Sequence, residues 1–169
     1  MKKSPLQKQL DEQKFQNAIA YVRGMAGGLK KLTSSEMVYL NQLLTGHSDD
    51  PWRIEAVEVQ IPSGERHQFN LISNPLSRAR DIIGNAFQKA GNSDVSAAAS
   101  YFYSQLVLEH LFIDANRRTA VLATLWLILV HKMDLDAQEL LTTPLGNLRD
   151  PENIKSLGKR IEVLLRPLS

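Results

Sequence analysis

The chain has no cysteine, and this absence excludes several kinds of chemistry at once. Its 169 residues contain no disulfide, no thiol nucleophile and no zinc site built on cysteine. A cysteine-free chain fits a reducing compartment, so we expect a cytoplasmic location. The N-terminal stretch MKKSPLQKQLDEQKFQ is charged and lacks the apolar segment of a signal peptide, so no signal peptide is expected.

Long apolar runs and a large net charge are also missing. The longest run with almost no polar side chain is Thr119 to Val130, whereas a membrane-spanning helix needs about 20 apolar residues. We therefore expect a buried core helix here and no membrane partner. The net charge of +2 argues against a nucleic-acid partner, since general nucleic-acid binders usually carry a basic stripe. With 43% hydrophobic and 22% charged residues, the composition is that of one globular domain.

Apolar residues recur at helical spacing over most of the chain, which predicts a mainly α fold. The first helix is expected over residues 4–23, with glycines from Gly24 onward ending it. A second helix is expected between a cap at Thr33 or Ser34 and a stop at Gly46. Further helices are predicted over residues 76–90, from a cap at Ser93 to His110, from Arg117 or Arg118 to His131, over residues 134–141 and over residues 151–165.

One β pattern interrupts the helical spacing. Residues 56–61, AVEVQI, alternate apolar and polar side chains, residues 62–65, PSGE, predict a turn, and residues 68–71, QFNL, can return as a second strand. The expected architecture is a single, mainly α domain with one small β-hairpin, in which the apolar helix passes through the middle.

Residues 110–120, HLFIDANRRTA, gather polar groups just before the apolar helix. A helix N-terminus offers free N–H groups and the positive end of a dipole, where anions bind. Arg117 and Arg118 add bidentate donors that suit phosphate oxygens. Asp114 could hold Mg²⁺ through one carboxylate while phosphates supply other ligands, and His110 could act as a general base near neutral pH. This set predicts phosphoryl or nucleotidyl transfer to a protonated nucleophile.

The same residues also fit a purely structural turn. An Asp-Ala-Asn sequence before a helix is commonly a capping arrangement, and a histidine beside leucine and phenylalanine often packs in a core. Paired arginines on a first helical turn are usually solvated. Spacing alone does not separate an anion site from a capped turn.

HLFIDANRRTA resembles the signature of the Fic/Doc (Fido) family, His-x-Phe-x-Asp/Glu-Gly/Ala-Asn-Gly/Lys-Arg. The matching positions are His110, Phe112, Asp114, Ala115, Asn116 and Arg118. The resemblance implies a Fido-type helical domain with its core over residues 33–145 and its motif at 110–118. Residues 1–32 would then form an N-terminal helical extension, and residues 146–169 a C-terminal helix packed on the same domain.

The resemblance also implies roles for single residues. His110 would deprotonate the hydroxyl of a Ser, Thr or Tyr in a target protein, and Asp114 would coordinate Mg²⁺ between phosphates. Phe112 would anchor the loop in the core. The hairpin, residues 57–70, resembles the flap that aligns the target segment by strand addition. The residues expected to bind the nucleotide are Ala115, Asn116, Arg117 and Arg118.

Fic enzymes usually transfer AMP from ATP, whereas Doc-type proteins bind the nucleotide reversed and transfer the γ-phosphate. Arg117 stands where Fic enzymes have glycine and Doc has lysine, so it could block the usual phosphate pose or grip a phosphate. Val121 stands where Fic enzymes often carry a further arginine, and Ala115 is also Doc-like. We favour AMP transfer with Mg²⁺ and ATP. A Doc-like protein kinase and a non-catalytic module that binds a partner through its flap stay as alternatives.

Many family members are inhibited by a glutamate in a Ser/Thr-x-x-x-Glu-Gly/Asn helix. Residues 142–147, TTPLGN, have glycine at the glutamate position, and Ser156 is followed four places on by Arg160. A separate antitoxin, as in toxin–antitoxin pairs, is therefore retained as a partner, and a homo-oligomer is left open. His47, His67 and His131 are expected in surface or capping roles.

Two further expectations concern residues around the motif. Trp52 is expected to pack under a loop, next to Arg53. Glu109 is expected to face away from His110, because consecutive residues of a helix point in different directions.

Overall fold

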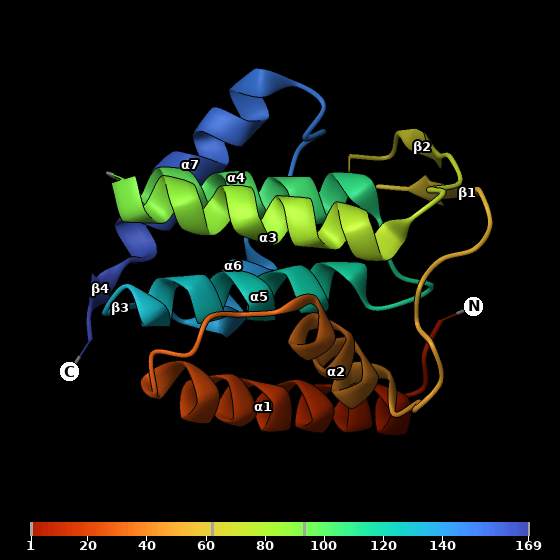
Figure 1. Ribbon diagram of the computed structural model, residues 1–169. Helices are drawn as coiled ribbons and strands as arrows, with labels where there is room; N and C mark the ends of the chain where they lie inside the picture. Colours follow the sequence, from red (N-terminus) through yellow and green to blue (C-terminus); the bar gives the residue numbers. More distant parts are fainter. Residues whose placement is uncertain (1, 62, 93, 169) are drawn as a thin grey trace.

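Seven helices and two short β-ribbons account for most of the residues that the computed structural model describes, 2–61, 63–92 and 94–168. The predicted mainly α fold with a small hairpin is confirmed (Figure 1). The helices are α1 (Pro5–Gly27), α2 (Ser34–Thr45), α3 (Pro75–Asn92), α4 (Val95–Glu109), α5 (Asn116–Val130), α6 (Ala137–Thr142) and α7 (Pro151–Leu164). The strands are β1 (Val57–Gln60), β2 (Arg66–Phe69), β3 (Met133–Asp134) and β4 (Arg166–Pro167).

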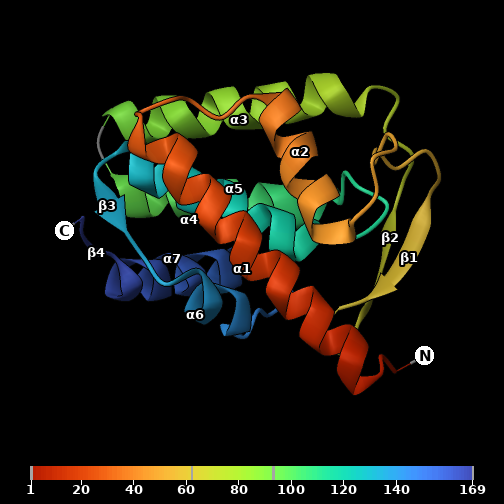
Figure 2. The same cartoon turned by 90° about the horizontal axis from the view of Figure 1, so that it is seen from below.

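Helix α5 is the centre of the fold. It packs against α1, α2, α4 and α6, and every residue from Thr119 to Leu129 is buried. Figures 1 and 2 show α1 and α2 on one side of it and the α3–α4 pair on the other. Removing this much apolar surface from water is the main source of stability, so the apolar run is a core helix, as predicted. No helix among the described residues is long and apolar enough to cross a bilayer.

Local signals place the ends of α2 correctly, but not the end of α1. The hydroxyl of Thr33 caps α2, which ends at Gly46 in the left-handed conformation, as predicted. Helix α1 does not end at Gly24 but continues to Gly27, because Ala26 still packs in the core and offsets the low helix propensity of glycine. The predicted cap of α4, Ser93, lies outside the described residues.

The remaining corrections are short shifts. Asp94 caps α4 through its carboxylate, and Asp136 caps α6, so that α6 begins three residues after the predicted position 134. Helix α5 begins at Asn116, just before the predicted arginines. Residue 134 instead lies in β3, which pairs with β4 in a ribbon that the sequence did not predict. The Asp134 carboxylate there accepts hydrogen bonds from Arg23 and Arg166.

The predicted hairpin is present, with its second strand two residues earlier than expected. Strands β1 and β2 are antiparallel, with Val57 opposite Phe69 and Val59 opposite His67. The side chains of His67 and Phe69 are buried, whereas their neighbours in β2 are exposed. The hairpin therefore turns an aromatic face toward the end of α4, where the motif lies.

Helices α1 and α7 pack directly on this core, α1 against α5 and α7 against α4. The boundaries proposed at residues 32/33 and 145/146 stay a prediction, although the C-terminal helix does lie on the same domain.

Candidate functional site

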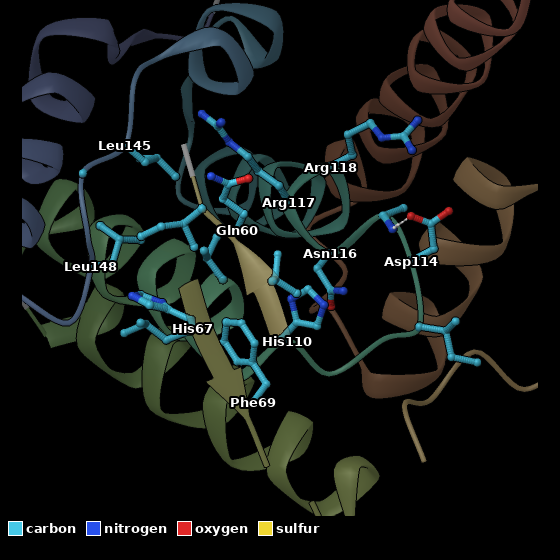
Figure 3. Close-up of a pocket in the computed structure, with 17 residues that line it drawn as sticks. Gln60, His67, Phe69, His110, Asp114, Asn116, Arg117, Arg118, Leu145 and Leu148 are labelled. Carbon is cyan, nitrogen blue, oxygen red and sulfur yellow. Dashed lines mark hydrogen bonds between the residues drawn. The ribbon is translucent and has the colours of Figure 1, made fainter. Parts of the chain in front are cut away.

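The motif opens onto a cavity of about 370 Å³ that all the predicted site residues line (Figure 3). Its walls are the end of α4, the loop 110–115, the start of α5, the hairpin and residues 145–148. The motif residues at its surface are His110, Asp114, Ala115, Asn116, Arg117 and Arg118.

His110 ends α4 in the left-handed conformation, with φ 50° and ψ 56°. This backbone turn directs the imidazole toward the hairpin, where its ring stacks on Phe69 with the ring centres 4.6 Å apart. Burial lowers the pKa of His110, and the positive charge of Arg53 lowers it further, while Asp114 acts in the opposite direction. A neutral imidazole is the form that can accept a proton.

The sequence predicts only a loop at Arg53. In the structure this residue is only 4% exposed and contacts the backbone of His110. Its Nε donates to the His110 carbonyl at 2.6 Å, and its other N–H groups donate to four further carbonyls. Burial lowers the pKa of this guanidinium. A single arginine in a polar loop carries no sequence signal for such a role, because its partners are backbone atoms.

The loop itself is held by Asn116 and by aromatic stacking. The Asn116 amide accepts from the N–H of Phe112 and donates to its carbonyl, both at 2.9 Å. Phe112 is buried, as predicted, and its ring stacks on Trp52 at 4.8 Å. Trp52 thus packs under the loop as expected. In this arrangement the polar atoms of Asn116 hold the loop closed, a role that the motif pattern does not indicate.

Asn41, on α2, is a second residue that sequence reasoning missed. It is 1% exposed, and its Nδ2 donates to the Asp114 carbonyl at 2.8 Å and to Thr119 Oγ1 at 3.1 Å. These contacts fix the backbone between the carboxylate of Asp114 and the start of α5.

The start of α5 has no side-chain cap. Its N-cap residue is Ala115, in the left-handed conformation with φ 58°. Among the described residues we find no acceptor for the backbone N–H groups of Asn116, Arg117 and Arg118. The six other helices all have a side-chain cap, including α3, where Asn74 accepts from the N–H of Ser77 at 3.0 Å.

The two arginines diverge, as Figure 3 shows. Arg117 Nε donates to the Tyr103 hydroxyl at 3.1 Å and its Nη2 to the Thr143 carbonyl at 2.5 Å, so it links α4, α5 and the end of α6. Arg118 also borders a hollow of about 240 Å³ against Asp11 of α1. Its Nη1 is buried without a hydrogen-bond partner in the described part of the chain, which suits an anion.

Asp114 is the only carboxylate among the residues that line the cavity. Its Oδ1 accepts from the N–H of Ala115 at 2.7 Å. The described residues contain no group of three or more metal-ligating side chains. A divalent ion here would therefore take one carboxylate from the protein and its other ligands from phosphate and water, which is usual for Mg²⁺.

Residues 145–149 close the far side of the cavity against β2. Leu145 and Leu148 line the wall, and Asn147 donates to the Glu65 carboxylate at 2.5 Å. Arg149 donates to the Gln68 carbonyl at 3.1 Å and lies over the ring of Phe69 at 5.6 Å. One backbone carbonyl of β2, that of Gln68, is thereby already bonded, and the turn before β2 is held through Glu65.

Two neighbouring residues test the earlier expectations. Glu109 pairs with Arg78 at 2.7 Å and so faces away from His110, as predicted. His67 is 5% exposed and lines the cavity, so the surface or capping role expected for it was wrong. Its alternation with exposed neighbours in β2 was the available signal.

No protein-family model matches the sequence, and no curated protein matches it either. Solved structures do match in fold. A Fic domain containing signaling protein from Bacteroides thetaiotaomicron superposes with a TM-score of 0.72 at 13% identity, over 97% of this chain and 70% of that protein. A Fic family protein from Desulfovibrio desulfuricans superposes with a TM-score of 0.58 at 13% identity, over 97% of this chain.

This chain spans 46% of the length of the Desulfovibrio protein. At 13% identity, the likeness concerns the fold. The chain has the fold of Fic domain proteins, as the resemblance of residues 110–118 predicted.

Proposed function

We propose that this protein transfers part of ATP, with AMP favoured, to the hydroxyl of a Ser, Thr or Tyr in a target protein. The observation that carries the proposal is the uncapped start of α5 beside a half-buried histidine in one cavity. Free N–H groups at a helix start bind phosphate, and a neutral imidazole accepts the proton of a nucleophile. The reaction would take place in the cytoplasm.

In this proposal His110 is the general base. Its lowered pKa favours the neutral imidazole, which can take the proton from the hydroxyl as the oxygen attacks phosphorus. In AMP transfer the bond from the α-phosphorus to the bridging oxygen breaks and pyrophosphate leaves, whereas in γ-phosphate transfer ADP leaves. The stack on Phe69 holds the ring in one orientation.

The N–H groups of residues 116–118 and the guanidinium of Arg118 would bind phosphate oxygens. Asp114 would hold Mg²⁺, which when bound neutralises charge on the phosphates. Figure 3 shows the Arg118 side chain directed toward α1, so its guanidinium, whose buried Nη1 lacks a partner among the described residues, would turn toward the cavity to bind phosphate.

The choice between AMP and phosphate transfer depends on the residues that replace the Fic pattern. Arg117 is held by Tyr103 and Thr143, away from the N–H groups at the start of α5, which favours the usual Fic pose. Val121 is fully buried in the core, so no second arginine extends from that turn. That observation favours the second candidate, transfer of the γ-phosphate with reversed ATP.

The target segment would add to the outer edge of β1. The hairpin has two strands, and Arg149 already bonds to the Gln68 carbonyl of β2 while Asn147 bonds to Glu65 in the turn. An exposed strand edge binds an extended peptide through main-chain hydrogen bonds. A separate antitoxin stays part of this proposal as an inhibitory partner, since no inhibitory glutamate motif was found in the sequence.

The test is paired labelling of a cell lysate with ATP that carries the label on the α- or the γ-phosphate, in the presence of Mg²⁺. A labelled protein from the α-label alone, absent with His110→Ala, would establish AMP transfer. A band from the γ-label alone would establish the kinase instead. Blank gels in both, with wild-type protein that is folded, would contradict both reactions and leave a module that binds a partner.

Arg117→Gly separates the readings of that position. We expect improved AMP transfer if the guanidinium obstructs the phosphates, and lost γ-phosphate transfer if it grips them. A fall in stability with transfer unchanged would show that Arg117 serves only as the link to Tyr103 and Thr143.

A further inference from the structure

Arg53 is a buried cation that the proposed reaction does not use directly. A guanidinium has five N–H donors, and all five of its donors here have carbonyl acceptors. The distances are 2.6 Å to His110, 2.6 Å to Glu55, 3.2 Å to Phe69, 3.0 Å to Asn70 and 3.4 Å to Glu109. Within the described ranges Arg53 makes no ion pair, and its side-chain hydrogen bonds all go to backbone carbonyls.

The five carbonyls belong to parts of the chain that are distant in sequence. Glu109 and His110 end α4, whereas Phe69 and Asn70 lie at the end of β2. The backbone N–H of Arg53 also donates to the Leu111 carbonyl at 2.9 Å. One side chain therefore holds the last residue of α4 at a fixed position relative to the hairpin.

The side chains of the same two segments are also in contact. The rings of Phe69 and His110 lie 4.6 Å apart and are inclined by 22°. His110 and Phe69 are thus connected in two ways. Their rings stack, and their backbone carbonyls both accept hydrogen bonds from Arg53. We propose that Arg53 is a positioning residue that couples the hairpin to His110, so that a displacement of the hairpin moves the imidazole. The inference rests on the proposed function only in taking His110 as the base.

This coupling gives the site a means of sensing its target. A peptide segment that adds to the edge of β1 would shift the hairpin. The other strand of the hairpin, β2, is connected to His110 through Arg53 and Phe69. The imidazole is then placed by the docked hairpin as well as by α4. A lysine cannot replace Arg53, because one ammonium with three donors does not span five carbonyls.

Electrostatics offers an independent readout of the same contact. Arg53 is among the causes that lower the pKa of His110, after burial, and Asp114 raises it. Glu109, next to His110 on α4, is paired with Arg78. The other titratable or charged groups that line the cavity are His67, Arg117 and Arg118.

The experiment follows the His110 imidazole by NMR in the absence of nucleotide, with its signals assigned by their loss in His110→Ala. We expect Arg53→Gln to raise the pKa of His110 and to reduce the ring-current shift that Phe69 causes. Arg53→Lys keeps the charge, so the pKa should rise less, but the ring-current shift should fall equally. The control is Arg23→Gln, which removes an ion pair with Asp134 and should change neither signal.

Phe69→Leu tests the other half of the contact with Arg53 intact. It should raise the pKa of His110 by exposing the imidazole. In the double variant, Arg53→Gln should raise this pKa further by less than it does alone, because only the loss of its charge still acts once Phe69 is gone. A folded Arg53→Gln protein with the wild-type pKa and ring-current shift would overturn the proposal. If neither Arg53 variant folds, an unchanged His110 pKa in Phe69→Leu overturns it.

Transfer assays separate this inference from the proposed function. Arg53→Gln should lower kcat by about tenfold or more with KM for ATP little changed, since misplaced catalytic groups cost large rate factors. A wild-type protein without transfer activity would contradict the proposed function and leave the NMR result to decide on Arg53.

Discussion

Replacing Asn116 by alanine separates a loop-holding residue from a phosphate ligand. The substitution removes both hydrogen bonds to Phe112 and leaves the N–H and the carbonyl of that buried residue unpaired. An unpaired buried group costs about 1–3 kcal/mol, so the two together cost about 2–6 kcal/mol. Alanine is a better helix former than asparagine by about 0.5 kcal/mol, which offsets part of the loss. We expect the free energy of unfolding to fall by about 1.5–5.5 kcal/mol.

Urea unfolding in the absence of nucleotide and Mg²⁺ measures this loss, because a residue that acts only as a ligand leaves the empty protein unchanged. Asn116→Asp keeps the acceptor for the Phe112 N–H but not the donor, and its charge is favourable at a helix start, so about half the loss is expected. Asn17→Ala, at an exposed position of α1, is the control and should change stability by about 0.5 kcal/mol or less. An Asn116→Ala protein as stable as this control refutes the reasoning.

Two further predictions concern Asn41 and the pKa of His110. Asn41→Ala leaves the Asp114 carbonyl and the Thr119 hydroxyl without their donor, so urea unfolding should show a loss of about 2–4 kcal/mol, and a loss below about 1 kcal/mol would contradict the assigned bonds. Because the folded state lowers the pKa of His110 below its ordinary value of about 6.5, the unfolded chain binds more protons. Stability should therefore fall as pH decreases through about 6.5, and His110→Asn should lack this part of the decrease. If the stability of the wild-type protein and of His110→Asn fell equally with pH, this prediction would be wrong.

The sequence predicted the parts of the site that act through their own residue type. His110, Asp114, Arg117 and Arg118 were placed at the end of one helix and the start of the next, and the structure brings them to one cavity. The apolar periodicity of α5 located the buried helix for the same reason, since burial follows the side chain.

The residues that sequence reasoning missed act on backbone atoms. Arg53 and Asn41 bind carbonyls, and no pattern of side chains marks a carbonyl that needs a donor. Residues 145–149 contact the hairpin although the two segments are distant in sequence. Asn147 and Glu65, for example, are 82 residues apart. Such contacts depend on tertiary packing, which local propensity does not describe. The ribbon of β3 and β4 also depends on a contact between distant segments. Each of its strands is only two residues long, which is too short to give a sequence pattern.

The loop departs from local rules at both of its ends. His110 and Ala115 both have positive φ, which is uncommon in residues other than glycine. Leu29, His110 and Lys132 follow the ends of α1, α4 and α5, where chains commonly turn, so the unusual position is Ala115. At Ala115 the departure comes at a helix start, where a Ser, Thr or Asp cap would add about 1 kcal/mol.

Among the described residues, a side chain caps each of the six other helices, so its omission at α5 is specific to this place. Asp114 is one residue too early to cap the helix and instead bonds to the N–H of Ala115. Its carboxylate is thereby kept beside the free N–H groups without occupying them. A loop that gives up local stability at Ala115, the position that sets its anion site, is expected of a functional site. Asn116 and Asn41 then account for how the loop keeps this shape, because both bind the backbone between His110 and Ala115.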